Sequence, residues 1–180
     1  METNQRNRIS KFLSLILRHA PETIGLVLDE HGWADVGELI TRATQKGKSF
    51  SRAELDEVVI TNDKQRFAFN EDKSRIRASQ GHSIDVELQL EIKEPPETLY
   101  HGTVPKFLDN IRRQGLQKMS RHHVHLSADR STAEKVGSRR GEAVILIVRS
   151  KEMHADGFEF FLSENGVWLT NHVPVKYIDF

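Results

Sequence analysis

The pattern of apolar and polar positions in the first 80 residues begins with a helical spacing. Ile9, Phe12, Leu13 and Ile16 recur every three or four positions, which predicts an amphipathic helix over residues 5–20. Proline cannot continue a helix, so we expect Pro21 to end it. Arg18 and His19 would then lie in the last helical turn.

Two further helices are predicted from their capping residues. Asp35 and Ser51 are residue types that favour the N-cap position, and Gly47 is suited to ending the first of the two helices. The apolar positions expected to be buried are Val36, Leu39 and Ile40 in one helix and Leu55, Val58 and Val59 in the other.

Strand patterns lie before and after these two helices. Residues 26–28 form a short apolar run, and residues 64–77 alternate about a polar turn, which predicts a hairpin. Phe67 and Phe69 share one face of that hairpin, so Arg66 should project outward. Helix, strand, helix, helix and hairpin is the order of a winged-helix module.

Polar and proline-rich segments interrupt the pattern after residue 80. Between them, residues 84–90 alternate as a strand would. We therefore predict a first domain at residues 1–80, a linker region with a short strand at 81–95 and a second domain at 96–180.

The second half is predicted to be rich in β-structure, so the whole chain is expected to have an α+β fold. Strands are expected at residues 99–101, 124–127 and 143–148, with a final strand pair at 166–170 and 173–177, and helices at 104–114 and 131–136.

Composition narrows the possible classes of protein. The 180 residues are 37% hydrophobic and 29% charged, as in ordinary globular proteins. Cysteine is absent, which excludes disulfides, thiolate zinc sites and thiol catalysis. The N-terminal residues lack the apolar core of a signal peptide, and no apolar run approaches a membrane span of about 20 residues. We expect a cytoplasmic protein without membrane contact.

Charge is balanced, with 26 basic and 26 acidic residues. A duplex-binding domain usually carries a basic excess, because its affinity rests on phosphate neutralisation. Any nucleic-acid contact must therefore depend on a few well-placed arginines.

Basic and hydroxyl side chains gather at the ends of the apolar runs. Arg18 and His19 can complement the dipole at a helix C-terminus, or they can clamp a phosphate. Arg66 by itself is typical of a solvated position, and gains meaning only if other arginines converge on it. Arg139 and Arg140 lie between two glycines, in a solvated turn or facing an anion.

Two histidine-containing segments have more than one interpretation. His101, Gly102 and Thr103 end a strand, where a glycine allows close approach of a ligand to the backbone, although a polar turn is also possible. His123 and His125 alternate onto one face and could bind a metal, but no third ligand stands at a recognisable spacing. Phosphate-loop, Rossmann and Gly-x-Ser-x-Gly motifs are absent.

Together these segments resemble the RNA 2′-phosphotransferase family, which includes the tRNA 2′-phosphotransferases. The resemblance covers nearly the whole chain, and its matching segments are residues 10–19, 32–33, 64–67, 76–83, 99–103, 123–127, 136–139 and 165–170.

The resemblance implies a winged-helix lobe joined to a lobe like an ADP-ribosyltransferase, with the active site in the cleft between them. It also implies NAD as a consumed co-substrate, no metal, and RNA with an internal 2′-phosphate as the substrate. The phosphate would attack NAD, releasing nicotinamide and giving an ADP-ribosylated RNA. Transesterification would then release 2′-hydroxyl RNA and ADP-ribose 1″,2″-cyclic phosphate.

The family's functional residues match specific positions of this chain. Its essential Arg-His-Arg-Arg set corresponds to Arg18, His19, Arg66 and Arg139, and its NAD contacts correspond to His101, Gly102, Thr103 and Ser127. Arg18 and Arg66 are expected to bind the phosphate, and His19 and Arg139 to assist transesterification. Arg140 stands where many relatives have histidine.

The resemblance also implies a role in tRNA splicing or RNA processing, and we expect a monomer. Two other readings remain open. One is an ADP-ribosyltransferase that acts on terminal phosphates of nucleic acids or on another acceptor. The other is a non-catalytic winged-helix protein that binds nucleic acid.

Overall fold

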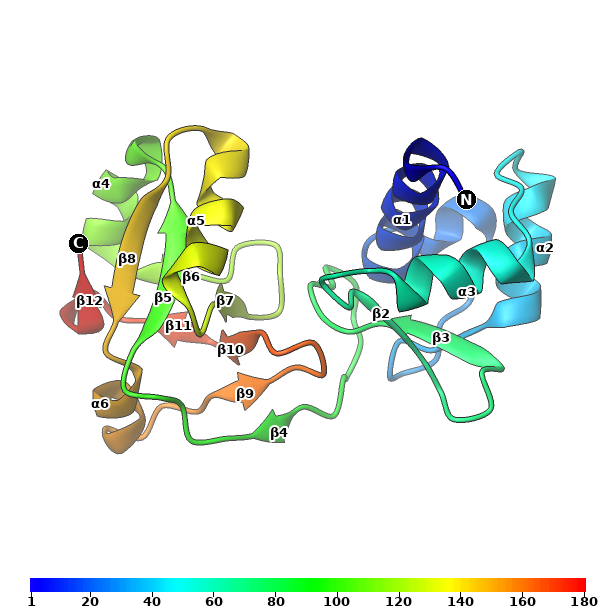
Figure 1. The fold of residues 1–180 in the computed structure, drawn as a ribbon. Helices are drawn as coiled ribbons and strands as arrows, with labels where there is room; N and C mark the ends of the chain where they lie inside the picture. Colours follow the sequence, from blue (N-terminus) through cyan, green and yellow to red (C-terminus); the bar gives the residue numbers. More distant parts are fainter. The chain divides into compact units, whose positions relative to one another are not determined.

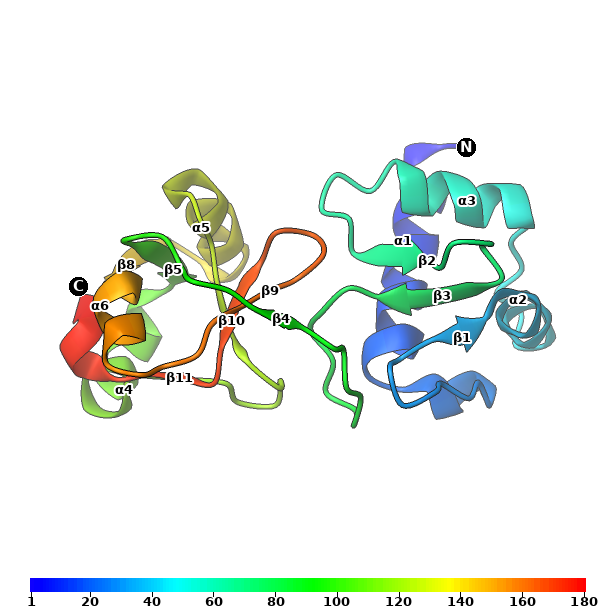
Figure 2. The same cartoon turned by 90° about the horizontal axis from the view of Figure 1, so that it is seen from below.

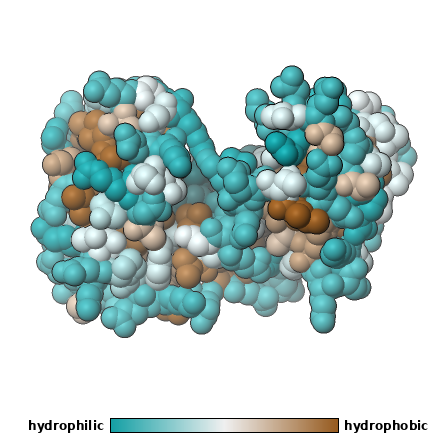
Figure 3. Space-filling view, in the orientation of Figure 1, coloured by the Kyte–Doolittle hydropathy of each residue, from teal (hydrophilic) through white to brown (hydrophobic).

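The computed structural model describes residues 1–180 and divides the chain into two compact units, Met1–Gln89 and Leu90–Phe180 (Figure 1). Each unit has its own apolar core. Helices accompany small antiparallel sheets in both units, so the fold is α+β. None of the helices combines the length and the apolar character that crossing a membrane requires. Most of the surface seen in Figure 3 is hydrophilic, with small apolar patches.

Three α-helices form most of the first unit. They are α1 (Thr3–Arg18), α2 (Val36–Gln45) and α3 (Arg52–Ile60), and the short 3₁₀ helix η1 (Pro21–Ile24) follows α1. The predicted apolar face of α1 is confirmed, because Ile9, Leu13 and Ile16 are buried. Helix α1 ends at Arg18, and Pro21 begins η1.

The predicted caps of α2 and α3 are confirmed. The Asp35 carboxylate accepts a hydrogen bond from the Glu38 amide at 2.7 Å. Ser51 and Glu54 form a capping box, in which each side chain accepts from the backbone amide of the other. These contacts satisfy amides that have no partner within the helix, which is why the sequence located both helix starts.

The first unit also contains an antiparallel sheet of order β1-β3-β2 (Figure 2). Its strands are β1 (Ala34–Asp35), β2 (Phe67–Phe69) and β3 (Arg75–Ala78). The predicted hairpin is therefore confirmed. The strand predicted at residues 26–28 is wrong, because the Leu26 amide donates to the Pro21 carbonyl at 3.0 Å and closes a turn.

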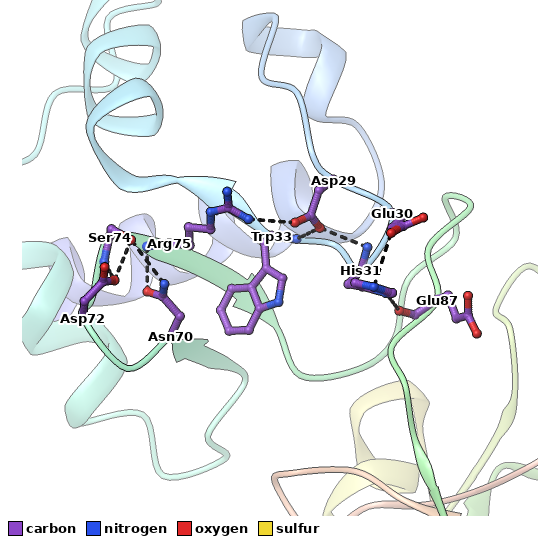
Figure 4. A network of polar contacts seen from close by, with 9 residues as sticks. All are labelled: Asp29, Glu30, His31, Trp33, Asn70, Asp72, Ser74, Arg75 and Glu87. Carbon is purple, nitrogen blue, oxygen red and sulfur yellow. Dashed lines mark hydrogen bonds and ion pairs between the residues drawn. The ribbon is translucent and has the colours of Figure 1, made fainter.

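A polar network joins this sheet to the turn before β1 (Figure 4). Asp29 accepts from the Trp33 amide at 2.9 Å and from the Arg75 guanidinium at 3.1 Å. The Arg77 guanidinium lies over the Trp33 ring, 4.4 Å from its centroid. Trp33 is thus held by its backbone and by a cation–π contact.

The second unit alternates short strands and helices. Its helices are α4 (Pro105–Gln114), α5 (Arg130–Gly137) and α6 (Ser150–Ala155), with 3₁₀ helices η2 (Ser138–Arg140) and η3 (Val175–Tyr177). Its strands are β4 (Glu91–Ile92), β5 (Leu99–Thr103), β6 (Leu116–Gln117), β7 (Val124–Leu126), β8 (Val144–Val148), β9 (Phe161–Leu162), β10 (Trp168–Thr170), β11 (His172–Val173) and β12 (Ile178–Asp179).

The strands of the second unit form three small sheets. Their orders are β12-β8-β5, β4-β9-β10-β7 and β11-β6. Tyr100 and Ser127 exchange backbone hydrogen bonds of 2.9 and 2.8 Å, so the strand β5 and the end of β7 lie side by side. This junction places the two predicted NAD-contacting segments next to each other.

Two further strand predictions are wrong. Residues 84–90 form no strand, because the Glu87 amide donates to the Glu30 carbonyl in a loop rather than to a neighbouring strand. Strand β10 pairs with β7 and β9, not with residues 173–177. Helix α6 was not predicted, since its 6 residues are too few to show a helical period.

Candidate active site

Arg18 and His19 close the C-terminus of α1. The His19 amide donates to the Leu15 carbonyl at 3.0 Å, so the backbone is still hydrogen-bonded to the helix at this position. Arg18 is half-buried and His19 is exposed. Both side chains therefore start from a rigid element, while the imidazole is accessible from solvent.

Ser83 forms hydrogen bonds with both of these residues. Its amide donates to the Arg18 carbonyl at 2.9 Å, and its hydroxyl lies 2.8 Å from the His19 Nδ1. This hydrogen bond orients the ring and sets which nitrogen faces Ser83. The matching segments include Ser83, but no pattern in the sequence assigned it this role.

Arg66 is held by two loops of the first unit. Its carbonyl accepts from the buried Ser79 amide at 2.9 Å, and its own amide lies 3.5 Å from the Asn62 side-chain oxygen. Gln65, just before it, has a left-handed backbone with φ of 41°, and its carbonyl accepts from the Ser79 hydroxyl. Arg66 is half-buried and lies just before β2.

The segment from Ser79 to Ser83 brings these residues together. Ser83 binds the backbone of Arg18, and Ser79 binds the backbone of Arg66. Four residues of fully extended chain span about 14 Å at most, so one short segment is hydrogen-bonded to the backbones of both arginines. Guanidinium groups donate to phosphate oxygens in pairs, and this arrangement is therefore suited to a phosphate.

His101 lies on β5, and one of its ring nitrogens already makes a hydrogen bond. Its Nδ1 donates to the His125 carbonyl at 3.0 Å. Burial lowers the pKa of His101, and the positive charge of Arg121 lowers it further. The imidazole is thus held neutral, and its Nε2 is available to accept a hydrogen bond from a ligand hydroxyl or amide.

Thr103 and Ser127 lie on the same pair of strands as His101. Thr103 ends β5 and is buried, and Ser127 is half-buried beside Tyr100. The structure therefore places all four residues that were predicted to contact NAD on β5 or at the adjoining end of β7.

Gly102 has a packing role that the sequence did not indicate. A Cβ atom at this position would lie 1.8 Å from the Ala133 carbonyl oxygen and 2.8 Å from the Gly137 amide nitrogen. Strand β5 and helix α5 approach so closely that only glycine fits. This contact alone is sufficient to require Gly102, whether or not a ligand touches its backbone.

Arg139 and Arg140 are exposed in η2, and a third arginine lies near them. Burial lowers the pKa of Arg121, and the charges of Arg140 and Arg139 lower it further. Arg121 also donates to His125 Nδ1 at 3.2 Å. Three mutually repelling guanidinium groups form a site suited to an anion. Arg121 was not predicted, because its only signal in the sequence is a basic residue just before the histidine run.

The histidine run itself has no metal-site geometry. His123 packs its ring against Phe161 with centroids 5.4 Å apart, and burial lowers its pKa. His125 instead receives the Arg121 hydrogen bond. No group of three or more His, Asp or Glu side chains in residues 1–180 is arranged to hold a metal ion.

Arginine and histidine clusters of this kind are typical of proteins that bind phosphate-bearing ligands. Comparison with known proteins is more specific. The model of the family described as RNA 2′-phosphotransferase, Tpt1 / KptA family matches residues 4–172. The chain belongs to this family of enzymes.

Individual relatives are similar over nearly their full length. A protein of Flavobacterium johnsoniae named "Probable RNA 2′-phosphotransferase" is 64% identical over 180 residues, covering 100% of this chain and 99% of the relative. Proteins with the same name from Burkholderia pseudomallei and Escherichia coli are 56% and 53% identical. They cover 96% and 94% of this chain, and 94% and 93% of their own lengths.

Proposed function

We propose that this chain removes an internal 2′-phosphate from RNA and transfers it to NAD, which is consumed as a co-substrate. The 2′-phosphate displaces nicotinamide from NAD and becomes ADP-ribosylated. A hydroxyl of the transferred ADP-ribose, on the ribose that carried nicotinamide, then attacks the phosphorus. RNA leaves with a free 2′-hydroxyl, and ADP-ribose 1″,2″-cyclic phosphate is formed. Membership of the RNA 2′-phosphotransferase family supports this proposal.

The observation that carries the proposal is the convergence of Arg18, His19 and Arg66 on the Ser79–Ser83 segment. Arg18 and Arg66 bind the 2′-phosphate of the RNA. The phosphate is itself an anionic nucleophile and nicotinamide leaves as a neutral group from a cationic precursor. The first step therefore depends on positioning more than on a general base.

His19 acts mainly in the second step. Transesterification needs a proton for the departing RNA oxygen and charge stabilisation at the phosphoryl group. An exposed imidazole at the end of α1 can supply either. Ser83 orients that imidazole through the hydrogen bond at Nδ1.

The second unit has donors and acceptors that fit NAD. Ribose hydroxyls and the nicotinamide amide are hydrogen-bond donors, and His101 presents a neutral Nε2 that can accept from them. Ser127 adds a hydroxyl group opposite Tyr100 near the start of β5, and Thr103 adds one at the other end of that strand. The Arg121, Arg139 and Arg140 charges suit the pyrophosphate and the phosphoryl group in transfer.

The family resemblance gives Arg139 of the second unit a part in the same reaction as Arg18 and Arg66 of the first. We accordingly propose that the first unit is a winged-helix lobe, since three helices precede its β2–β3 hairpin, and that the second is similar to an ADP-ribosyltransferase. The proposal extends to a monomer that processes tRNA-like RNA in the cytoplasm.

The test is incubation of the purified protein with a short RNA that carries one internal 2′-phosphate, with and without NAD. Mass spectrometry should show NAD-dependent loss of the phosphate and release of ADP-ribose cyclic phosphate. His19→Ala should accumulate the ADP-ribosylated RNA. Transfer of ADP-ribose to a terminal phosphate without loss of the 2′-phosphate would contradict the proposal, as would RNA binding without any NAD-dependent change.

A further inference from the structure

A polar pocket lies beside Arg66, entirely within the first unit. Its volume is about 280 Å³. Helix α1, the end of α3 and the loop before β2 line it, through Arg6, Asn7, Ser10, Val58, Thr61, Asn62, Asp63 and Arg66. The proposed reaction assigns a role to Arg66 alone among these residues.

Helix α1 carries an unusual charge distribution for a chain of zero net charge. It contains no acidic residue between Thr3 and Arg18, and its basic residues are Arg6, Arg8, Lys11 and Arg18. The positive end of a helix dipole lies at its N-terminus, so basic side chains in the first turns are electrostatically unfavourable there. An anionic ligand at that end would offset this cost.

One face of α1 connects the proposed phosphate site with the pocket. Asn7, Lys11, Ser14 and Arg18 follow each other at spacings of four, three and four residues, which places them in one row along the helix. Each is exposed or half-buried. A rise of 1.5 Å per residue gives the row a length of about 17 Å. A polar path therefore extends from Arg18 to the pocket.

The pocket itself is built to bind a polar, anionic group. The half-buried Arg6 side chain has no hydrogen bond or ion pair within the chain. Asn62 donates to the Ser10 hydroxyl at 3.4 Å, so amide and hydroxyl groups lie together on one wall. The charges of Arg6 and Arg66 exceed that of Asp63, so the lining is net positive.

We propose that this pocket binds a nucleotide that flanks the 2′-phosphorylated position of the RNA. Arg6 contacts the backbone phosphate of that nucleotide, and Asn7, Ser10 and Asn62 contact its sugar or base edge. Pockets for whole small-molecule ligands usually begin near 300 Å³, so this one suits part of a strand rather than a separate ligand. This inference rests on the proposed function, since it takes the clamp at Arg18 and Arg66 as the anchor.

The test compares two substrates, a 2′-phosphorylated dinucleotide and a hexanucleotide with one internal 2′-phosphate. Wild-type protein should show the lower KM for the hexanucleotide. Arg6→Ala should raise the KM for the hexanucleotide roughly tenfold, as expected for loss of a charge-assisted hydrogen bond, and the KM for the dinucleotide much less. Arg8→Ala is the matched control, because Arg8 is exposed on the same helix but does not line the pocket.

A second variant and a binding measurement make the result decisive. Asn7→Asp places a negative charge in the pocket and should weaken binding of a fluorescent hexanucleotide, measured by anisotropy without NAD. Circular dichroism checks that both variants are folded. Equal KM values for both substrates in wild-type protein, or equal effects of Arg6→Ala and Arg8→Ala, would overturn the inference. Absence of phosphate removal from both substrates, with hexanucleotide binding still sensitive to Arg6, would instead overturn the proposed function.

Discussion

The two units hold their candidate histidines in opposite environments. His19 is exposed at the end of α1 and shares a hydrogen bond with the Ser83 hydroxyl. His101 lies within a sheet, donates to a carbonyl and has a pKa lowered by burial. An exposed imidazole can exchange protons, whereas a half-buried one with a fixed tautomer can accept a hydrogen bond. The difference supports the proposal that His19 transfers a proton and that His101 recognises a ligand.

Substitution of the arginines in the first unit is expected to have the largest effect, which is on kcat. Arg18→Ala or Arg66→Ala should lower kcat by about 10²–10³-fold, because each removes donors that stabilise charge on the phosphoryl oxygens. The rate of NAD-dependent phosphate removal measures this, with circular dichroism to confirm the fold. Arg8→Ala should retain the wild-type kcat. Wild-type kcat in both clamp variants would show that the phosphate is bound elsewhere.

Gly102 tests whether the second unit needs glycine for packing or for ligand approach. Gly102→Ala should destabilise this unit by about 3 kcal/mol, near the upper end of typical overpacking costs, because α5 must move away from β5. The chain has two tryptophans, Trp33 and Trp168, one in each unit. In a Trp33→Phe background, urea unfolding followed by fluorescence therefore reports the second unit. Unchanged stability with lost NAD binding would favour ligand approach instead.

The lowered pKa of His101 predicts a pH dependence confined to the second unit. Below the ordinary value of 6.5, the unfolded chain binds a proton more tightly than the folded chain does, so stability decreases as the pH falls. Urea titrations between about pH 7.5 and pH 5 should show this loss. His101→Asn keeps an amide donor for the His125 carbonyl and cannot titrate, so its stability should fall less over this range. It should also raise the KM for NAD roughly tenfold. An identical pH dependence in wild type and variant would exclude His101 as the titrating group.

Ser83 gives the smallest expected effect. Ser83→Ala removes the hydroxyl beside His19 but keeps the backbone hydrogen bond to Arg18. Loss of one neutral hydrogen bond of about 1 kcal/mol should lower kcat about fivefold. Ser74→Ala is the control, since Ser74 contacts Asp72 in the hairpin turn (Figure 4). A decrease as large as that of Arg18→Ala would mean that Ser83 also contributes directly to the chemistry.

Helices were predicted more reliably than strands, for a local reason. A cap such as Asp35 or Ser51 satisfies amides within three residues, so its evidence lies in adjacent sequence. A strand depends on a distant partner. Residues 84–90 alternate as a strand should, but no neighbouring strand pairs with them.

Site residues follow the same rule. Resemblance to the family pointed to Arg18, His19, Arg66 and Arg139, whereas the contacts of Ser83 and Arg121 are seen only in the folded structure. A serine hydroxyl or an arginine just before a histidine run is common in any sequence. Their significance comes from a 2.8 Å contact with His19 and from the nearby charges of Arg139 and Arg140.

The sequence by itself determined the α-helices other than α6, the caps of α2 and α3, the β2–β3 hairpin and the family resemblance, because all of these depend on local spacing or on short ordered motifs. Only the tertiary structure decided how the strands pair and why Gly102 must be glycine. It also showed how Ser79 and Ser83 bring Arg66 to Arg18. The physical reason is that pairing, close packing and hydrogen bonding between distant residues follow from how the chain folds back on itself, and no local pattern records that.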